Sequence, residues 1–220
     1  MQSLSSRFES IQAQLAGASL IAVSKYAEDQ QLIEAYELGL RDFAENYVIP
    51  AIDKKQRLNL AGVRWHLIGP LQSNKVNKAV GEFDLIHSVH SLELAEQINK
   101  RAEKLGIKQK ILLQVNFTDK NGFAPEQVRE AYSKVLELAN IDLQGLMTMG
   151  PHKISAESET IYQRMRQMKE ELVQAHSLGV LELSMGMSND YHLALQHGST
   201  MVRIGSALFG ERLTREKQGN

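Results

Sequence analysis

Leu183-Ser-Met-Gly-Met-Ser-Asn-Asp190 and Met201-Val-Arg-Ile-Gly-Ser-Ala-Leu-Phe-Gly210 are two stretches in which a short apolar strand runs into glycine and serine. Near the amino end, Leu20-Ile-Ala-Val-Ser-Lys25 is a third apolar strand, and it ends in a lysine. Similar apolar runs recur along the chain between longer segments of helical period. This alternation is the sequence pattern of repeated βα units.

The repeated units can be placed by residue number. We expect strands near residues 19–25, 42–46, 64–69, 84–89, 110–116, 142–149, 181–186 and 201–205. An amphipathic helix opens the chain at about residues 3–16, and the clearest later helices are 29–39, 91–105, 125–139 and 155–177. Ser91 can cap the helix that follows it, and Gly106 suits the left-handed position after that helix.

Eight strands that alternate with helices, without a linker or a shift in composition, predict a fold of the α/β class. We expect residues 1–220 to form one domain, a single (β/α)8 barrel with an extra N-terminal helix. An open, doubly wound sheet is the structural alternative. A chain of 220 residues is long enough for one sizeable core.

Composition excludes several classes of protein. The 25 basic and 26 acidic residues give a formal net charge of −1, which favours neither nucleic acid nor an anionic membrane as a partner. The chain has no cysteine, so disulfides, thiolate metal sites and a cysteine nucleophile are excluded. The seven histidines show no metal-ligand spacing. With no signal-peptide pattern and no apolar run of membrane length, we expect a cytoplasmic protein.

A barrel presents its ligand groups at the carboxyl ends of its strands. Five polar residues fall at or just before the ends of different predicted strands: Lys25, Asn46, His66, Ser184 and Arg203. His66 and Asn46 could line a pocket, although a histidine between Trp65 and Leu67 is also typical of a core. The positions of these side chains predict a binding site at one mouth of the barrel.

A phosphate site is predicted beside them. Ser188 follows Gly186, and Gly205-Ser206 follows Arg203, so glycine backbone and helix starts could offer N–H groups to an anion. Alternatively, Ser188 is only a helix cap and Gly205 only a packing residue. Asp190 argues mildly against phosphate, because a carboxylate in the first helical turn would compete with it.

Lys25 adds an amine to this site. A lysine forms a Schiff base when its neutral form is accessible, and we expect Lys25 to enter the barrel mouth rather than face solvent. The alternative is an ordinary charge on the rim. An amine together with a phosphate site indicates a phosphorylated carbonyl compound, and pyridoxal 5′-phosphate (PLP) is the leading candidate.

Arg203 lies within a buried strand and therefore needs an acceptor. One possibility is an internal ion pair. The other places the guanidinium against the pyridine nitrogen of the cofactor, where a permanent charge keeps that nitrogen unprotonated. This arrangement weakens the ring as an electron sink and suits cofactor holding better than carbanion chemistry.

Seven segments together resemble the pyridoxal-phosphate homeostasis protein family, whose fold is similar to the N-terminal barrel of alanine racemase. They are Val23-Ser-Lys25, Phe43-Ala-Glu-Asn-Tyr47, Trp65-His-Leu-Ile-Gly-Pro-Leu-Gln-Ser-Asn-Lys75, His87-Ser-Val, Gly145-Leu-Met147, Leu183 to Asp190, and Val202-Arg-Ile-Gly-Ser206 with Phe209-Gly210. The resemblance implies that Lys25 forms the Schiff base with PLP and that Ser188, Gly205 and Ser206 hold phosphate. It also implies that Arg203 lies near the pyridine nitrogen and that Asn46 and His66 line the pocket.

Some positions depart from the family pattern. Ala44 stands where the family usually has glycine, and Ile49-Pro50 replaces a glutamine–glutamate pair. The loop Asn116-Phe-Thr-Asp-Lys-Asn-Gly122 is shorter than usual. Lys120 within it could be a second lysine for cofactor handover, or a solvated turn charge.

Three functions follow from these residues. The resemblance favours a PLP-binding protein of intracellular PLP homeostasis without dedicated turnover, whose recipients would be PLP-dependent apoenzymes. An amino-acid racemase would need a second acid/base from an additional domain, and the sequence ends at Thr214-Arg-Glu-Lys-Gln-Gly-Asn220, so we expect none and favour a monomer. A class I aldolase would use a strand-end lysine without any cofactor, and it would be colourless.

Overall fold

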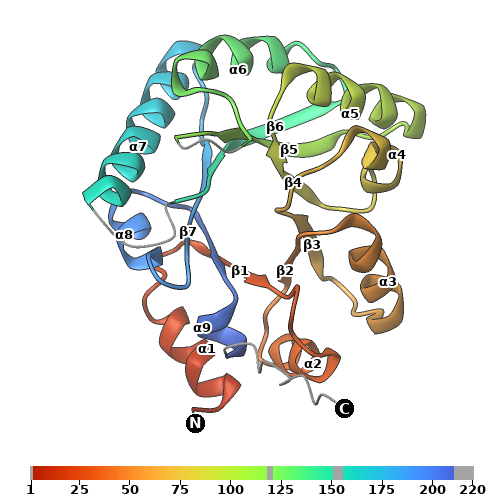
Figure 1. The fold of residues 1–220 in the computed structure, drawn as a ribbon, viewed down its shortest axis with the longest axis vertical. Helices are drawn as coiled ribbons and strands as arrows, with labels where there is room; N and C mark the ends of the chain where they lie inside the picture. Colours follow the sequence, from red (N-terminus) through yellow and green to blue (C-terminus); the bar gives the residue numbers. More distant parts are fainter. Residues whose placement is uncertain (1, 118–120, 151–155, 211–220) are drawn as a thin grey trace, which may run out of the picture.

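The computed structural model describes residues 2–117, 121–150 and 156–210. Parallel strands close into a barrel in chain order, from β1 to β8 (Figure 1). Their bounds are β1 (Ser19–Val23), β2 (Asp42–Glu45), β3 (Arg64–Leu67), β4 (Leu85–Val89), β5 (Gln109–Val115), β6 (Ile141–Thr148), β7 (Glu182–Met187) and β8 (Met201–Ile204). The predicted (β/α)8 barrel is confirmed, and the doubly wound alternative is wrong.

Helices surround the barrel in Figure 1. The α-helices are α1 (Leu4–Gln12), α2 (Asp29–Glu37), α3 (Val48–Leu58), α4 (Val76–Ala79), α5 (Leu92–Leu105), α6 (Val128–Leu136), α7 (Ala156–His176), α8 (Tyr191–Gln196) and α9 (Ser206–Phe209), and the 3-10 helices are η1 (Ser73–Lys75) and η2 (Pro125–Gln127). The extra N-terminal helix α1 lies beside α9, where Arg7 Nε donates to the Leu208 carbonyl at 2.7 Å. None of the helices in the described part of the chain is long and apolar enough to cross a membrane.

Local chemistry explains the helix ends that the sequence predicted. The Ser91 hydroxyl accepts a hydrogen bond from the Leu94 N–H at 3.2 Å and begins α5, and Gly106 adopts φ 64° after its last turn. The predicted helix at 125–139 begins instead as the 3-10 turn η2, with Pro125 at its first position, and its α-helical part is α6.

The strands have two differently lined faces. The outer face packs against the helices in one large apolar core. On the inner face a small apolar cluster is formed by Leu85, Leu112 and Met147, with Met149 and Met201 packed against it. Register pairs His66 with Leu85 and Ser184 with both Met147 and Met201, so these two polar side chains also face the barrel interior. The inside of the barrel is therefore part apolar and part polar.

Candidate functional site

A buried chain of hydrogen bonds crosses the barrel interior. Arg203 Nη1 donates to Ser184 Oγ at 2.7 Å, and Ser184 Oγ lies 2.9 Å from His87 Nδ1. His87 Nε2 lies 2.9 Å from His66 Nδ1, and His66 Nε2 lies 3.0 Å from Asp42 Oδ1. Three of the predicted site residues, on β3, β7 and β8, are thus joined through a histidine on β4.

One assignment of these hydrogen bonds gives every ring nitrogen a partner with His87 neutral. Burial lowers the pKa of His87 well below its usual value, and the neighbouring His66 and Arg203 lower it further, so the ring is neutral. Ser184 then donates its hydroxyl proton to Nδ1, and Nε2–H of His87 donates to His66. His66 in turn donates its Nε2–H to Asp42. In this arrangement every ring nitrogen of His66 and His87 has a hydrogen-bond partner.

Asp42, at the far end of this row of hydrogen bonds, is an ionised carboxylate. Burial alone would raise its pKa, but the hydrogen bonds from His66 and Arg64 lower the pKa to about 2. Arg64 binds both carboxylate oxygens, at 2.6 and 2.5 Å. The carboxylate therefore fixes the ring of His66 and, through it, the side chains further along the chain.

The Arg203 guanidinium is held by neutral acceptors. Its side chain is 2% exposed, and Nη2 donates to the Thr148 carbonyl at 2.8 Å. Among the residues that the structure describes, no carboxylate forms an ion pair with it. Burial lowers the pKa of Arg203 to about 10, against the opposing effect of Tyr162 and Asp190. The internal ion pair, the structural alternative for this arginine, is not found in the described part of the chain.

The residues predicted to hold phosphate come together at the ends of β7 and β8. The N–H groups of Gly205 and Ala207 both donate to Ser188 Oγ, each at 3.2 Å. Asp190 does not compete, because its carboxylate accepts from the Met187 N–H at 2.6 Å and from the Tyr162 hydroxyl at 2.7 Å. The two N–H donors therefore converge on the hydroxyl oxygen of Ser188 at the carboxyl ends of these strands.

Ser188 is not a helix cap, since the residue that precedes α8 is Asp190. Gly205 does have a packing role: a Cβ there would lie 3.3 Å from the carbonyl oxygen of Val23 on β1. The close approach brings the Gly205 turn beside the strand that leads to Lys25. Ser206 is exposed at the first position of α9.

Lys25 lies two residues beyond the end of β1, and its side chain is exposed. Its Nζ lies 5.0 Å from the centre of the Tyr26 ring. The expectation that Lys25 does not face solvent is wrong, because the buried part of this segment ends at Ser24 and Lys25 is exposed. An exposed amine at this edge is accessible to a ligand that enters the mouth.

Asn46 follows the last residue of β2. Its Oδ1 is buried and has no hydrogen-bond partner among the described residues. A Cβ at Gly69 would lie 2.1 Å from the Asn46 carbonyl oxygen, so only glycine allows the end of β3 to pass so close. An unpaired buried oxygen is costly unless a ligand satisfies it.

Sequence reasoning missed some of this site. His66 and Arg203 lie one residue before the ends of β3 and β8, as expected, whereas Ser184 lies three residues before the end of β7. His87 and Asp42 were not predicted as site residues, although each is a polar residue in a buried strand. That signal, a polar side chain in a buried run, could have identified both. Among the described residues no group of three or more acidic or histidine side chains could hold a metal ion.

A family model and curated relatives match this sequence over most of its length. The family model described as alanine racemase, N-terminal domain, matches residues 1–213. The chain is 39% identical over 199 residues to the pyridoxal phosphate homeostasis protein of Aquifex aeolicus, covering 89% of this chain and 87% of that one. The chain belongs to the pyridoxal phosphate homeostasis protein family.

Two solved structures are similar to this protein in fold. PipY of Synechococcus elongatus, a structure with PLP bound, is 40% identical, has a TM-score of 0.89, and matches 94% of this chain and 100% of its own. The alanine racemase of Clostridium difficile is 19% identical with a TM-score of 0.82, over 96% of this chain and 57% of its own, and it shares the fold.

Proposed function

We propose that this protein binds PLP and serves in PLP homeostasis, with Lys25 as the amine that joins the cofactor. Support comes from PipY, solved with PLP bound, and from relatives named pyridoxal phosphate homeostasis proteins. The observation that carries the proposal is that the N–H groups of Gly205 and Ala207 converge on the Ser188 hydroxyl, beside the strand that leads to Lys25.

The residues of the mouth fit PLP by their chemistry. Gly205, Ala207 and Ser188 offer donors to a phosphate ester, and Arg203 offers a buried charge to the ring nitrogen. Asn46 has a polar side-chain atom without a partner among the described residues. When bound, PLP supplies an aldehyde and an aromatic ring conjugated with it.

Lys25 performs the covalent step. With PLP bound, this amine would be the group that joins the aldehyde, whose oxygen would leave as water. Because the side chain is exposed, the amine reaches an incoming ligand without rearrangement of the core. The chain of bonds from Asp42 to Arg203 holds the guanidinium in one orientation, and a permanently charged donor suits cofactor holding rather than carbanion chemistry.

Titration with PLP tests the proposal. The wild-type protein should develop visible absorbance with PLP, and Lys25→Ala should not. Ser188→Ala should weaken binding about tenfold, because a hydroxyl donor to the phosphate is lost. Full visible absorbance in Lys25→Ala would place the amine elsewhere in the chain.

We also propose that PLP-dependent apoenzymes receive the cofactor and that the protein acts as a cytoplasmic monomer. Light scattering on a size-exclusion column measures the mass directly and should give 24.7 kDa. Mixing the PLP-loaded protein with a PLP-free transaminase should restore the activity of that enzyme faster than PLP dissociates from the protein into solution. Lys120, proposed as a possible handover lysine, lies outside the described residues.

A further inference from the structure

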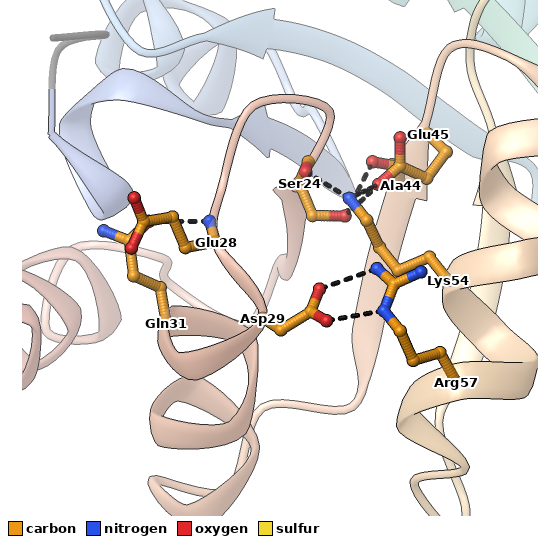
Figure 2. Close-up of polar contacts among 8 residues, drawn as sticks. All are labelled: Ser24, Glu28, Asp29, Gln31, Ala44, Glu45, Lys54 and Arg57. Carbon is orange, nitrogen blue, oxygen red and sulfur yellow. Dashed lines mark hydrogen bonds and ion pairs between the residues drawn. The ribbon is translucent and has the colours of Figure 1, made fainter.

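A buried ion pair lies next to Lys25 at the ends of β1 and β2. Lys54 on α3 and Glu45 on β2 are joined at 2.5 Å, and their side chains are 11% and 3% exposed (Figure 2). Neither residue takes part in the hydrogen-bond chain of the barrel interior or in the phosphate site. Their role therefore has to be sought in what else they contact.

Both residues bind Ser24, the neighbour of Lys25. Lys54 Nζ donates to the Ser24 carbonyl at 2.7 Å, and the Ser24 hydroxyl donates to Glu45 at 2.8 Å (Figure 2). The Ser24 N–H donates to the Ala44 carbonyl at 2.9 Å. All three polar groups of Ser24 are thus fixed, two of them by the ion pair.

The Ser24 carbonyl is the geometrically important group. A peptide unit is planar, so fixing this carbonyl also fixes the N–H of Lys25 and the direction in which its Cα leaves the strand. The same carbonyl accepts a bond from the Ala27 N–H at 3.1 Å, which closes the turn that carries Lys25. Lys54 occupies the second acceptor position of that oxygen and so holds the whole turn against α3.

Stability alone does not account for a charged pair at this place. Two apolar side chains of similar volume would serve a buried contact at least as well, because desolvation offsets most of the attraction between buried charges. An apolar pair could not, however, hold the Ser24 carbonyl.

We propose that Glu45 and Lys54 form a positioning pair that fixes the Ser24–Lys25 peptide and so aims the Lys25 amine at an aldehyde in the barrel mouth. The inference rests on the proposed function, in which Lys25 forms the Schiff base. Lys54 is not itself the reacting amine, because its ammonium is engaged by Glu45 and by the Ser24 carbonyl. The pair acts through Lys25 only.

The same helix provides a matched control. Arg57, one turn further along α3, binds Asp29 at 2.6 and 2.8 Å, and both side chains are largely exposed (Figure 2). This second ion pair also links α3 to the segment after β1, but it contacts neither Ser24 nor Lys25. Arg57→Met therefore removes a link of α3 without touching the proposed positioning contact.

The test compares Glu45→Gln/Lys54→Met with Arg57→Met and the wild type. The double variant removes both charges together and leaves neither one buried alone. Three quantities are measured: the rate at which borohydride-trapped PLP accumulates on Lys25, the affinity for pyridoxamine 5′-phosphate, which has the ring and phosphate but no aldehyde, and the denaturation midpoint of the PLP-free protein. Glu45→Gln alone, which keeps the size of the side chain, is the milder second variant should the double variant not fold.

The positioning role predicts that the double variant traps PLP on Lys25 about tenfold more slowly, because misaimed reacting groups lose rate. Its affinity for pyridoxamine 5′-phosphate should stay within about twofold, Glu45→Gln should slow trapping about threefold, and Arg57→Met should match the wild type. Trapping at the wild-type rate in either Glu45 variant overturns the inference, as does a parallel loss of trapping and of pyridoxamine 5′-phosphate affinity. If the wild type itself traps no PLP on Lys25, the proposed function fails instead.

Discussion

Replacing Arg203 with methionine removes the guanidinium from the barrel interior while keeping most of the side-chain volume. The structure shows what is lost in the PLP-free protein: two hydrogen bonds, to Ser184 Oγ at 2.7 Å and to the Thr148 carbonyl at 2.8 Å. No ion pair is broken, since within residues 2–117, 121–150 and 156–210 no carboxylate pairs with Arg203.

The two energetic terms of this change nearly cancel. Burial lowers the pKa of Arg203 from 12.5 to about 10, which corresponds to roughly 3 kcal/mol against the charged form. Because the pKa of a cation is lowered, this cost is present at every pH below about 10, and it is relieved only as the pH rises through that value. Two hydrogen bonds from a charged donor contribute about 1.5–3 kcal/mol each. We expect Arg203→Met to lower the free energy of unfolding by about 1–2 kcal/mol.

Cofactor binding should respond more strongly than stability. Loss of a charge-assisted contact to the PLP ring should weaken affinity about ten- to one-hundredfold. Chemical denaturation of the PLP-free protein and titration with PLP measure the two effects separately. Arg166→Met is the control, because Arg166 is largely exposed and pairs with Glu170 on its own helix, away from this hydrogen-bond chain. A loss of 3–5 kcal/mol with unchanged affinity would falsify the role of Arg203 as a ring contact.

Three further outcomes are expected. Lys25→Ala should change the unfolding free energy by less than about 0.5 kcal/mol, because the side chain is exposed, and a larger loss in a denaturation curve would contradict a ligand role. Asp42→Asn should lower the free energy of unfolding by about 2 kcal/mol at neutral pH. The lowered pKa of Asp42 stabilises the fold fully above about pH 4 and less as the pH falls toward 2. The melting curves of wild type and variant should therefore converge in acid. Gly69→Ala should destabilise strongly, because its Cβ would lie 2.1 Å from the Asn46 carbonyl oxygen, whereas Gly179→Ala, with open space around it, should melt with the wild type.

The order of elements was predictable because it depends on local patterns. Apolar runs of strand length and helical periods alternate along the whole chain, and caps such as Ser91 and Gly106 mark helix ends through contacts within a few residues. The grouping of Ser188 with Gly205 was also predictable, since adjacent parallel strands bring their carboxyl ends to one edge.

Contacts between distant segments were less accessible to sequence reasoning. His87 joins His66 to Ser184 only because the closed barrel directs side chains from β3, β4 and β7 to the same interior. Lys54 and Glu45 lie nine positions apart, and nothing local shows that a lysine on α3 reaches back to the end of β1. In both cases the missed signal was a charged or polar residue in a buried position, which requires a partner that the sequence does not identify.

Borohydride reduction of the wild-type protein with PLP, followed by peptide mapping, tests most directly whether Lys25 joins the cofactor. Reduction makes the C=N bond permanent, so the modified lysine carries the mass of the cofactor through digestion. We expect one modified peptide, the one that contains Lys25, and none from the control sample without PLP. Modification of a different lysine with Lys25 unmodified, or no modification at all, would contradict the proposed function.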